Sequence, residues 1–339
     1  MADGMGAMAQ DRLNSRSRAC DVTVHSCKRS TGGGDTQGVP MSLDASAREL
    51  LTDLIDRLSD RHDRGQTQDP SGLPTGFREL DQLTTGMHRG DLIVIAGRPS
   101  IGKSALALNV ATHVAIQQGT PVLIFSMEMD GRHVMDRLVS SISRVDLQRV
   151  RMAQLSDDDW SHAIEAFNLL SDAPLVIDDT PSLSVNELIA RANKRADAMG
   201  RLGLVVVDYM QLMAGGLTSN IETRAGQVGE ISRGLKRLAR ELGCPVVALS
   251  QLGRSPASRS DKRPTLADLR DSGAIECDAD VIVLLYRDDY TRAASMCTGL
   301  TEIIVGKQRN GPTGTVRLMF VGPLTTFESL AAPYGSSRG

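Results

Sequence analysis

The sequence predicts an α/β fold built on a mainly parallel β-sheet. From residue 73 onward, short apolar segments alternate with longer segments whose apolar residues recur at helical spacing. Two short segments, 204–207 and 281–285, are apolar at every position, as expected of strands that helices cover on both faces. Residues 97–104 fit the pattern G-x-x-x-x-G-K-[ST] and lie between such a strand and such a helix. Together these features indicate a P-loop domain.

The individual elements follow from the apolar pattern. Strands are predicted at 91–96, 121–126, 174–178, 203–208, 245–250, 280–286, 301–306 and 315–320. Helices are predicted near 103–118, 130–144, 157–171, 184–199 and 226–242. The last two strands have no helix between them, and the residues at 310–314 are typical of a turn. These two strands should therefore pair as a C-terminal hairpin.

A further helix is expected before the sheet, near residues 46–58. Ser46 and Glu49 have the spacing of a capping box at its start. One face of this helix is apolar, at Ala47, Leu50, Leu51, Leu54, Ile55 and Leu58. A polar stretch at 61–71 follows, so the apolar face either folds back on its own domain or packs on a partner.

These features divide the chain into four expected regions. Residues 1–41 contain few branched apolar residues and are expected to form a disordered leader. Residues 42–72 are expected to form the linker helix and a linker. Residues 73–330 should form the P-loop domain, and residues 331–339 a flexible tail.

The composition excludes some classes of protein. A chain of 339 residues with 41% hydrophobic content can bury a substantial core, and a net charge of −3 means that a nucleic-acid site must be a local patch. Aromatic residues make up only 3%, which disfavours recognition by base stacking. The five cysteines lack zinc-ligand spacing, and no apolar run approaches 18 residues. We therefore expect a cytoplasmic protein with reduced thiols and no membrane contact.

Residues 97–104 have the chemistry of a phosphate cradle. The glycines let backbone N–H groups turn inward, and the N-terminus of the following helix adds positive potential. Lys103 should reach the β- and γ-phosphates, and the Ser104 hydroxyl should hold Mg²⁺. The alternative is a glycine-rich turn with an exposed lysine. The predicted nucleotide-binding residues are Gly97, Arg98, Pro99, Ser100, Ile101, Gly102, Lys103 and Ser104.

Three polar residues follow buried strands at the edge where ligands bind in such sheets. Asp208 ends the strand at 203–208 and is a candidate Mg²⁺ ligand, or an ordinary turn aspartate. Glu128 is a candidate general base, and a helix cap is the equal alternative. Gln251 could sense the γ-phosphate or simply hold a loop in place.

Two basic features complete the candidate site. The segment 253–270 has a local excess of positive charge and is either a loop that follows a phosphate backbone or a solvated charge run. Lys307 and Arg309 lie at the end of the strand at 301–306. Such a pair of cations suits the charge that builds on a transferring phosphoryl group. The spacing does not decide whether the pair serves its own subunit or a neighbour.

From about residue 42 to 330, the chain resembles the C-terminal motor of the bacterial replicative DNA helicases, the DnaB family of RecA-like ATPases. The matching stretches are 73–77 with Leu80 and Asp81, 97–104, 125–129, 207–212, 247–252, 261–264, 268–273, 278–280 and 306–312. They occur in family order. The sequence Gly-Lys-Gln-Arg-Asn-Gly-Pro at 306–312, with Asp-Leu-Arg-Asp-Ser-Gly at 268–273, is specific to this family.

The resemblance implies a homo-hexameric ring with ATP and Mg²⁺ bound between subunits. Lys103, Ser104, Glu128, Asp208 and Gln251 would act from one subunit, and Lys307 and Arg309 would be supplied in trans by the next. Arg270, Asp271 and Gly273 match the loop that holds single-stranded DNA, with Arg254 and Arg263 as further DNA-binding candidates. The helix at 46–58 matches the linker helix that packs on the adjacent subunit.

Two positions depart from the family pattern, and neither removes a catalytic group. Cys277 stands where the family usually has glutamine, and Asp271 where it usually has glutamate. By the same resemblance, residues 1–41 are expected to stand in place of the family's helical N-terminal domain, which forms a collar and contacts primase. Binding of primase or of a helicase loader is therefore left open.

The favoured hypothesis is an ATP-dependent replicative helicase that moves 5′ to 3′ on single-stranded DNA and unwinds duplex. Two alternatives remain. One is a non-unwinding ring that binds single-stranded DNA or regulates a full-length helicase. The other is a recombination ATPase of the RecA type, which the helicase-type loop at 270–273 disfavours.

Overall fold

The computed structural model describes residues 46–63, 70–213, 224–253, 261–269, 273–288 and 298–330. The chain divides into two compact units, Met1–Thr67 and Gln68–Gly339. The expected leader at 1–41 and tail at 331–339 lie outside the described residues. The four-region division of the chain stays a prediction.

The described part of the first unit is one helix, α2 (Ala47–Asp63). The predicted capping box is confirmed: the Glu49 carboxylate accepts from the Ser46 backbone N–H and hydroxyl, and the Glu49 N–H donates to the Ser46 hydroxyl. Leu51, Leu54 and Ile55 recur on one helix face, and each is exposed. The helix therefore carries the apolar stripe that its sequence predicts.

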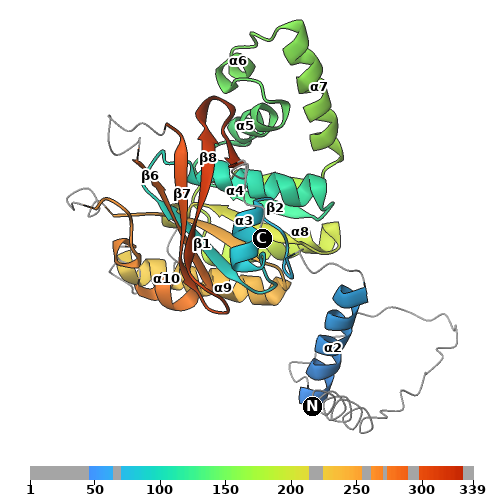
Figure 1. The fold of residues 1–339 in the computed structure, drawn as a ribbon, viewed down its shortest axis with the longest axis vertical. Helices are drawn as coiled ribbons and strands as arrows, with labels where there is room; N and C mark the ends of the chain where they lie inside the picture. The colour runs from blue at the N-terminus through green and yellow to red at the C-terminus, as the bar shows by residue number, and fades with distance from the viewer. Residues whose placement is uncertain are drawn as a thin grey trace, which may run out of the picture. The chain divides into compact units, whose positions relative to one another are not determined.

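The second unit is built on a mixed β-sheet (Figure 1). In the described residues the strand order is β3-β2-β4-β5-β1-β6-β7-β8-β9. The strands from β3 to β6 in that order are parallel, and β7, β8 and β9 continue the sheet in antiparallel pairing. The strands are β1 (Leu92–Gly97), β2 (Val122–Ser126), β3 (Leu175–Asp178), β4 (Leu204–Asp208), β5 (Val246–Gln251), β6 (Val281–Arg287), β7 (Leu300–Gln308), β8 (Gly314–Val321) and β9 (Thr326–Ser329).

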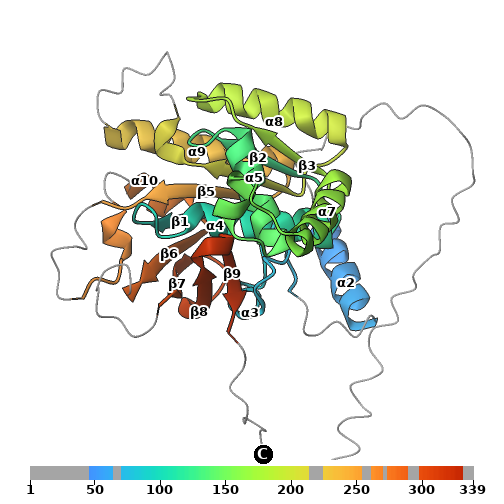
Figure 2. The same ribbon diagram turned by 90° about the horizontal axis from the view of Figure 1, so that it is seen from above.

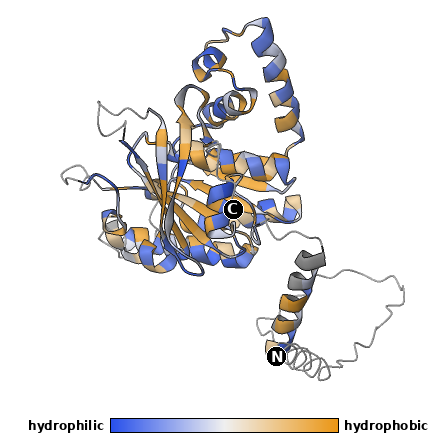
Figure 3. Cartoon of the chain, in the orientation of Figure 1, coloured by the Kyte–Doolittle hydropathy of each residue, from blue (hydrophilic) through white to orange (hydrophobic). Residues whose placement is uncertain are grey.

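Helices cover both faces of the sheet (Figure 2). The side chains of the central strands alternate between two apolar cores: in β1, Ile93 and Ile95 pack on one face, and Leu92 and Val94 on the other. The helices of the first face are α3 (Arg78–Thr84), α4 (Lys103–Thr112), α5 (Gly131–Ser143) and α7 (Asp157–Asp172), and those of the second are α8 (Val185–Met199), α9 (Arg224–Leu242) and α10 (Gly273–Asp278). Figure 3 shows the hydrophobic residues concentrated in the strands and on the helix faces that cover them. The predicted doubly covered parallel sheet is confirmed.

Several short elements were not predicted. These are α3, α6 (Leu147–Arg151), α10 and β9, and α4 passes into a π-helical turn at His113–Gln117. The predicted hairpin of β7 and β8 is confirmed by their ladder, which runs from Leu300–Met319 to Val305–Gly314. It does not end the sheet, because β9 pairs with β8. Within the described residues, no helix is both long and apolar enough to cross a bilayer.

Candidate functional site

The loop between β1 and α4 is shaped by two glycines. β1 ends at Gly97, and α4 begins at Lys103. Gly102, the residue before α4, has a φ of 112°, a left-handed conformation that glycine adopts without strain. A Cβ at Gly102 would lie 2.9 Å from the Cζ atom of Phe327, so the β9 ring supports the loop closely. The loop is thereby held where the N-terminus of α4, with its partial positive charge, faces a cavity.

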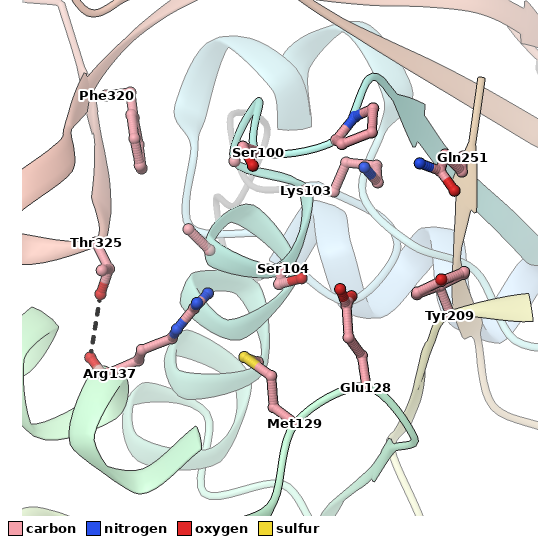
Figure 4. Close-up of a pocket in the computed structure, with 13 residues that line it drawn as sticks. Ser100, Lys103, Ser104, Glu128, Met129, Arg137, Tyr209, Gln251, Phe320 and Thr325 are labelled. Atoms are coloured by element: carbon pink, nitrogen blue, oxygen red, sulfur yellow. Dashed lines mark hydrogen bonds between the residues drawn. The ribbon is translucent and has the colours of Figure 1, made fainter. Parts of the chain in front are cut away.

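This cavity has a volume of about 370 Å³ (Figure 4), within the size range of small-molecule sites. Its lining includes seven residues that the sequence predicts for the site: Pro99, Ser100, Gly102, Lys103, Ser104, Glu128 and Gln251. The other predicted loop residues have supporting positions. Ile101 is buried in the core, and the Arg98 carbonyl accepts a hydrogen bond of 2.9 Å from Lys103 Nζ.

Six further residues line the cavity: Ala105, Met129, Arg137, Tyr209, Phe320 and Thr325. Ala105, Met129 and Tyr209 are chain neighbours of predicted residues, so their proximity was available from the sequence. Arg137 comes from α5, and its side chain extends toward Ser104 (Figure 4). Phe320 and Thr325 come from the C-terminal part of the chain. Their positions in the sequence give no sign that they lie near the loop, so they could not be predicted.

Ser104 lines the cavity, and the Asp208 carboxylate contacts the Ser104 side chain. Asp208 ends β4, is 5% exposed and hydrogen-bonds with the Ser104 side chain. Burial raises the pKa of Asp208, and the Ser104 hydrogen bond and the charges of Lys103 and Arg137 oppose that rise. A buried carboxylate beside a hydroxyl gives the oxygen ligands that Mg²⁺ prefers.

The residues present fit a magnesium ion bound together with phosphates. The pKa of Asp208 stays raised although Lys103 and Arg137 add positive charge, so a divalent cation would further favour the ionised carboxylate. The described residues contain no group of three or more His, Cys, Asp and Glu arranged to hold a metal. Mg²⁺ is commonly held by one or two protein ligands plus substrate phosphates, which is the arrangement that Ser104 and Asp208 would support.

Lys103 and Glu128 lie close to the Asp208 carboxylate. Burial lowers the pKa of Lys103, while the negative charges of Asp208 and Glu128 raise it. In the β2–β4 ladder, Ser126 is opposite Asp208, and the N–H of Met127 donates to the Asp208 carbonyl at 2.9 Å. This pairing carries Glu128, the next residue, to the sheet edge beside the loop.

Gln251 reaches the same edge from β5. It is the register partner of Gly97, so the end of β5 lies directly beside the start of the phosphate loop. The Gln251 N–H donates to the side chain of Gln211, and the amide of Gln211 in turn donates to the Ser250 hydroxyl at 2.8 Å. The structure therefore brings Lys103, Ser104, Glu128, Asp208 and Gln251 together at one sheet edge.

Lys307 and Arg309 lie at the opposite end of the parallel strands, where β1 and β6 begin. Lys307 is paired with Ile282 at the beginning of β6, and the N–H of Arg309 donates to the Asp280 carbonyl just before that strand. Lys307 Nζ donates to the carbonyls of Glu276 and Ala279, at the end of α10. The two cations are therefore not brought together with the phosphate loop of their own chain.

The predicted DNA-binding residues are only partly described. Arg254, Arg270 and Asp271 lie outside the described residues. Gly273 is the exposed first residue of α10. Arg263 makes a bidentate ion pair with Glu302 of β7, at 2.6 and 2.9 Å, and this pairing raises the pKa of Arg263. Its DNA-binding role stays a prediction.

Known proteins share this fold and much of this sequence. Residues 72–329 match the family model of the DnaB-like helicase C-terminal domain. The chain is 44% identical over 291 residues to the replicative DNA helicase DnaB of Geobacillus stearothermophilus and 43% identical over 283 residues to the replicative DNA helicase DnaC of Bacillus subtilis strain 168. These matches cover 86% and 84% of this chain but 63% and 62% of the relatives, so the chain spans less than two thirds of their length.

Two solved structures resemble it at 35% sequence identity, and both cover 85% of this chain. One is the ATPase domain of G40P, all of which is covered, with a TM-score of 0.79. The other is a DnaB-like replicative helicase that was described with its interactions with primase. That match has a TM-score of 0.76 and covers 68% of that chain.

Proposed function

The chain belongs to the family of DnaB-like helicase C-terminal domains, and on that premise we propose that it is the ATP-driven motor of a replicative DNA helicase. It would act as a homo-hexameric ring that translocates 5′ to 3′ on single-stranded DNA and unwinds duplex. The family membership disfavours the recombination-type alternative. The primase contacts of the solved relative make primase a candidate partner.

The cleft at the end of β1 supplies the residues for binding and hydrolysing ATP. The loop 97–104 and the N-terminus of α4 would hold the phosphates, with Lys103 released from the Arg98 carbonyl to the β- and γ-phosphates. Ser104 and Asp208 would hold Mg²⁺, which neutralises charge that develops on the phosphates. Glu128 would orient the attacking water and accept its proton.

The observation that carries the proposal is the position of the finger pair, Lys307 and Arg309. In the sheet register, Lys307 is opposite Ile282, and Ile282 is opposite Val94 of β1. The loop begins three residues beyond Val94, which is about 10 Å further along β1. From β7 to β1 there are two strand spacings, so Lys307 is also displaced from the loop by about 10 Å across the sheet. A lysine side chain is too short for that separation, and Lys307 turns toward α10 instead.

A cation that serves phosphate chemistry but cannot reach its own phosphate loop must serve another subunit. The two edges of the sheet therefore suit a head-to-tail assembly in which one copy offers the loop and the next offers the finger pair. Such heterologous contacts close into a ring when the rotation between copies allows it. The site is complete only at the boundary between two copies.

Single-stranded DNA would contact the segment that precedes α10. Arg270, Asp271 and Gly273 are the proposed backbone contacts, and Arg254 and Arg263 are proposed to add positive charge nearby.

The test is strand displacement on forked DNA with ATP and Mg²⁺. One fork carries a loading tail with a free 5′ end and the other a tail with a free 3′ end, and a native mass measurement runs in parallel. Hexamers that displace only from the 5′-tailed fork would support the proposal. ATP hydrolysis by hexamers without displacement from either fork would favour the non-unwinding ring. Displacement only from the 3′-tailed fork would overturn the direction.

A further inference from the structure

Asp280 joins the start of β1 to the finger pair. Its backbone N–H donates to the Leu92 carbonyl at 2.9 Å, and its own carbonyl accepts from the N–H of Arg309 at 2.9 Å. Its carboxylate accepts a further hydrogen bond from the same strand, from the Leu92 N–H at 2.8 Å. Asp280 is buried. The residue is therefore held in place by both its backbone and its side chain.

The two oxygens of the Asp280 carboxylate have different partners. Oδ2 accepts from the Leu92 N–H and from Lys236 Nζ of α9, at 2.8 and 2.5 Å. Lys236 also donates to the Gly90 carbonyl at 2.7 Å, just before β1. Oδ1 instead lies 3.6 Å from Nε of Arg309. One oxygen therefore anchors the carboxylate, while the other presents negative charge to the guanidinium group.

The Asp280 charge also acts on Lys307. Burial lowers the pKa of Lys307, the positive charge of Arg309 lowers it further, and the negative charge of Asp280 opposes both effects. Two neighbouring cations repel each other, and the repulsion is stronger where the protein partly excludes water. A carboxylate fixed beside them offsets that repulsion. Asp280 therefore favours the state in which both cations are charged and close together.

The ion pair with Asp280 leaves Arg309 able to bind a phosphate. A guanidinium group has five N–H donors, and the Arg309 side chain is 45% exposed. A long side chain loses conformational freedom when it is fixed in one place. A cation that the protein already holds in place does not incur that loss during the reaction, so it stabilises developing charge more effectively.

We propose that Asp280 is a positioning residue for ATP hydrolysis: its carboxylate, anchored on β1 and α9, holds Arg309 and Lys307 where the phosphates of the neighbouring copy meet them. The inference deepens the proposed function and rests on it, because it needs a finger pair that acts in trans. Asp280 acts only through the two cations. Lys307 and Arg309 remain the catalytic groups.

The test replaces Asp280 by asparagine in the full chain. The amide oxygen can take the place of Oδ2 and keep the hydrogen bonds from Leu92 and Lys236. The amide NH₂ then faces Arg309, so a donor stands opposite a donor. The matched control is Asp91→Asn, a half-buried aspartate in the same charge cluster, because the charges of Asp280 and Lys236 act on its carboxyl group. The measurements are kcat and KM for ATP, the Kd of a fluorescent ATP analogue, and the mass of the assembly.

We expect Asp280→Asn to lower kcat about tenfold or more, with the Kd of the analogue and the mass of the assembly unchanged. Asp91→Asn should keep the kcat of the parent protein. A parental kcat in Asp280→Asn, or an equal loss in both variants, would overturn the inference. Near-normal hydrolysis in Arg309→Ala would instead contradict the proposed function, whatever Asp280→Asn does.

A charge-balanced pair of variants separates positioning from folding. Asp280→Asn leaves Lys236 without its counter-charge, which can lower stability. Lys236→Met removes that ammonium group and keeps the length of the side chain, so the double variant carries neither charge. We expect Lys236→Met alone to hydrolyse ATP at close to the parental rate, and the double variant to fold and still have the low kcat. Recovery of kcat in the double variant would show that only the unpaired lysine matters, and would overturn the inference.

The pH dependence of kcat gives a readout that a purely structural role would not change. Lys307 must keep its proton to act on a phosphate, so kcat should fall as the pH rises through the pKa of Lys307. The charged or titratable groups that act on Lys307 are Arg309, Asp280, Cys277 and Glu276. Removing the Asp280 charge lowers the pKa of Lys307 further. The fall in kcat should therefore occur at a lower pH in Asp280→Asn than in Asp91→Asn, and a fall at the same pH in both would count against the inference.

Discussion

Lys307 lies opposite Ile282 in the ladder of β6 and β7, at the edge of the sheet where β6 begins. The phosphate loop leaves β1 at the other edge, after Gly97. This one pairing separates the finger pair from the proposed nucleotide cradle of the same chain. It is the structural reason for assigning Lys307 and Arg309 to a neighbouring copy.

Arg309→Ala should abolish hydrolysis and leave nucleotide binding intact. An arginine supplied in trans to a transferring phosphoryl group contributes about a thousandfold or more to the rate. The loop at 97–104, which we propose binds ATP, lies at the other end of the parallel strands. The matched control is Arg317→Ala, an exposed arginine of β8 in the same hairpin. The measurements are kcat for ATP hydrolysis and the Kd of a fluorescent analogue. Near-normal hydrolysis in Arg309→Ala would contradict the assignment.

Lys103→Ala should lose both tight ATP binding and hydrolysis. Lys103 lines the cavity and is held near Asp208 and Glu128, where it would neutralise the terminal phosphates. Lys194→Ala, an exposed lysine on α8, is the control and should behave as the parent protein. Isothermal titration with a non-hydrolysable ATP analogue measures the loss. Unchanged affinity in Lys103→Ala would mean that the cavity is not the nucleotide site.

Gly102→Ala should damage the loop more than Gly119→Ala. Both glycines have a positive φ, of 112° and 57°, so a side chain strains the backbone at either position. A Cβ at position 102 would lie only 2.9 Å from the Phe327 ring, whereas a Cβ at position 119 would have no atom within 4 Å. We expect a large loss of nucleotide affinity for Gly102→Ala and only a modest loss of stability, about 1 kcal/mol, for Gly119→Ala. Equal affinities in the two variants would contradict this reading of the loop.

Asp208→Asn should stabilise the nucleotide-free protein while abolishing Mg²⁺-dependent hydrolysis. Burial raises the pKa of Asp208 in the folded state, so the folded state disfavours the ionised carboxylate. The resulting loss of stability begins near the unfolded pKa, about 3.9, and is complete above the folded pKa. At neutral pH the variant should gain about 1 kcal/mol. As the pH rises from the unfolded pKa through the folded pKa, the parent protein should become less stable than the variant.

Thermal unfolding of both proteins across that pH range, without nucleotide, measures the effect. Asp261→Asn, at an exposed aspartate, controls for the loss of one negative charge. A variant that melts below the parent protein at neutral pH would show that Asp208 is stabilising, contrary to the direction of its pKa.

The parts of the fold that were predicted are those with a strong local signal. β1 and β4 are apolar at nearly every position because helices cover both sides, and the loop at 97–104 has a recognisable pattern in a recognisable place. The short elements were missed for physical reasons. α10 has six residues and β9 has four, too few to show a period, and β9 exists because β8 offers it an edge.

The candidate site shows the same division. Glu128, Asp208 and Gln251 could be predicted because parallel strands bring their carboxyl ends to one edge. Arg137 could not, because it is one of several polar positions on α5 and only the fold turns it toward Ser104. The hydrogen bonds from Lys307 to the end of α10 could not be predicted either. Their acceptors are backbone carbonyls 28 and 31 residues away, and a backbone carbonyl is present whatever the side chain is.

The most direct test of the central claim mixes two inactive variants. Lys103→Ala lacks a working cradle but keeps the finger pair, and Arg309→Ala keeps the cradle but lacks a finger. If each site forms between copies, co-assembled rings will contain boundaries where an intact cradle meets an intact finger pair, about a quarter of them at equal mixing. ATP hydrolysis by the mixture should then rise well above that of either variant alone. A mixture that stays inactive, although mass measurement shows mixed rings, would contradict the account.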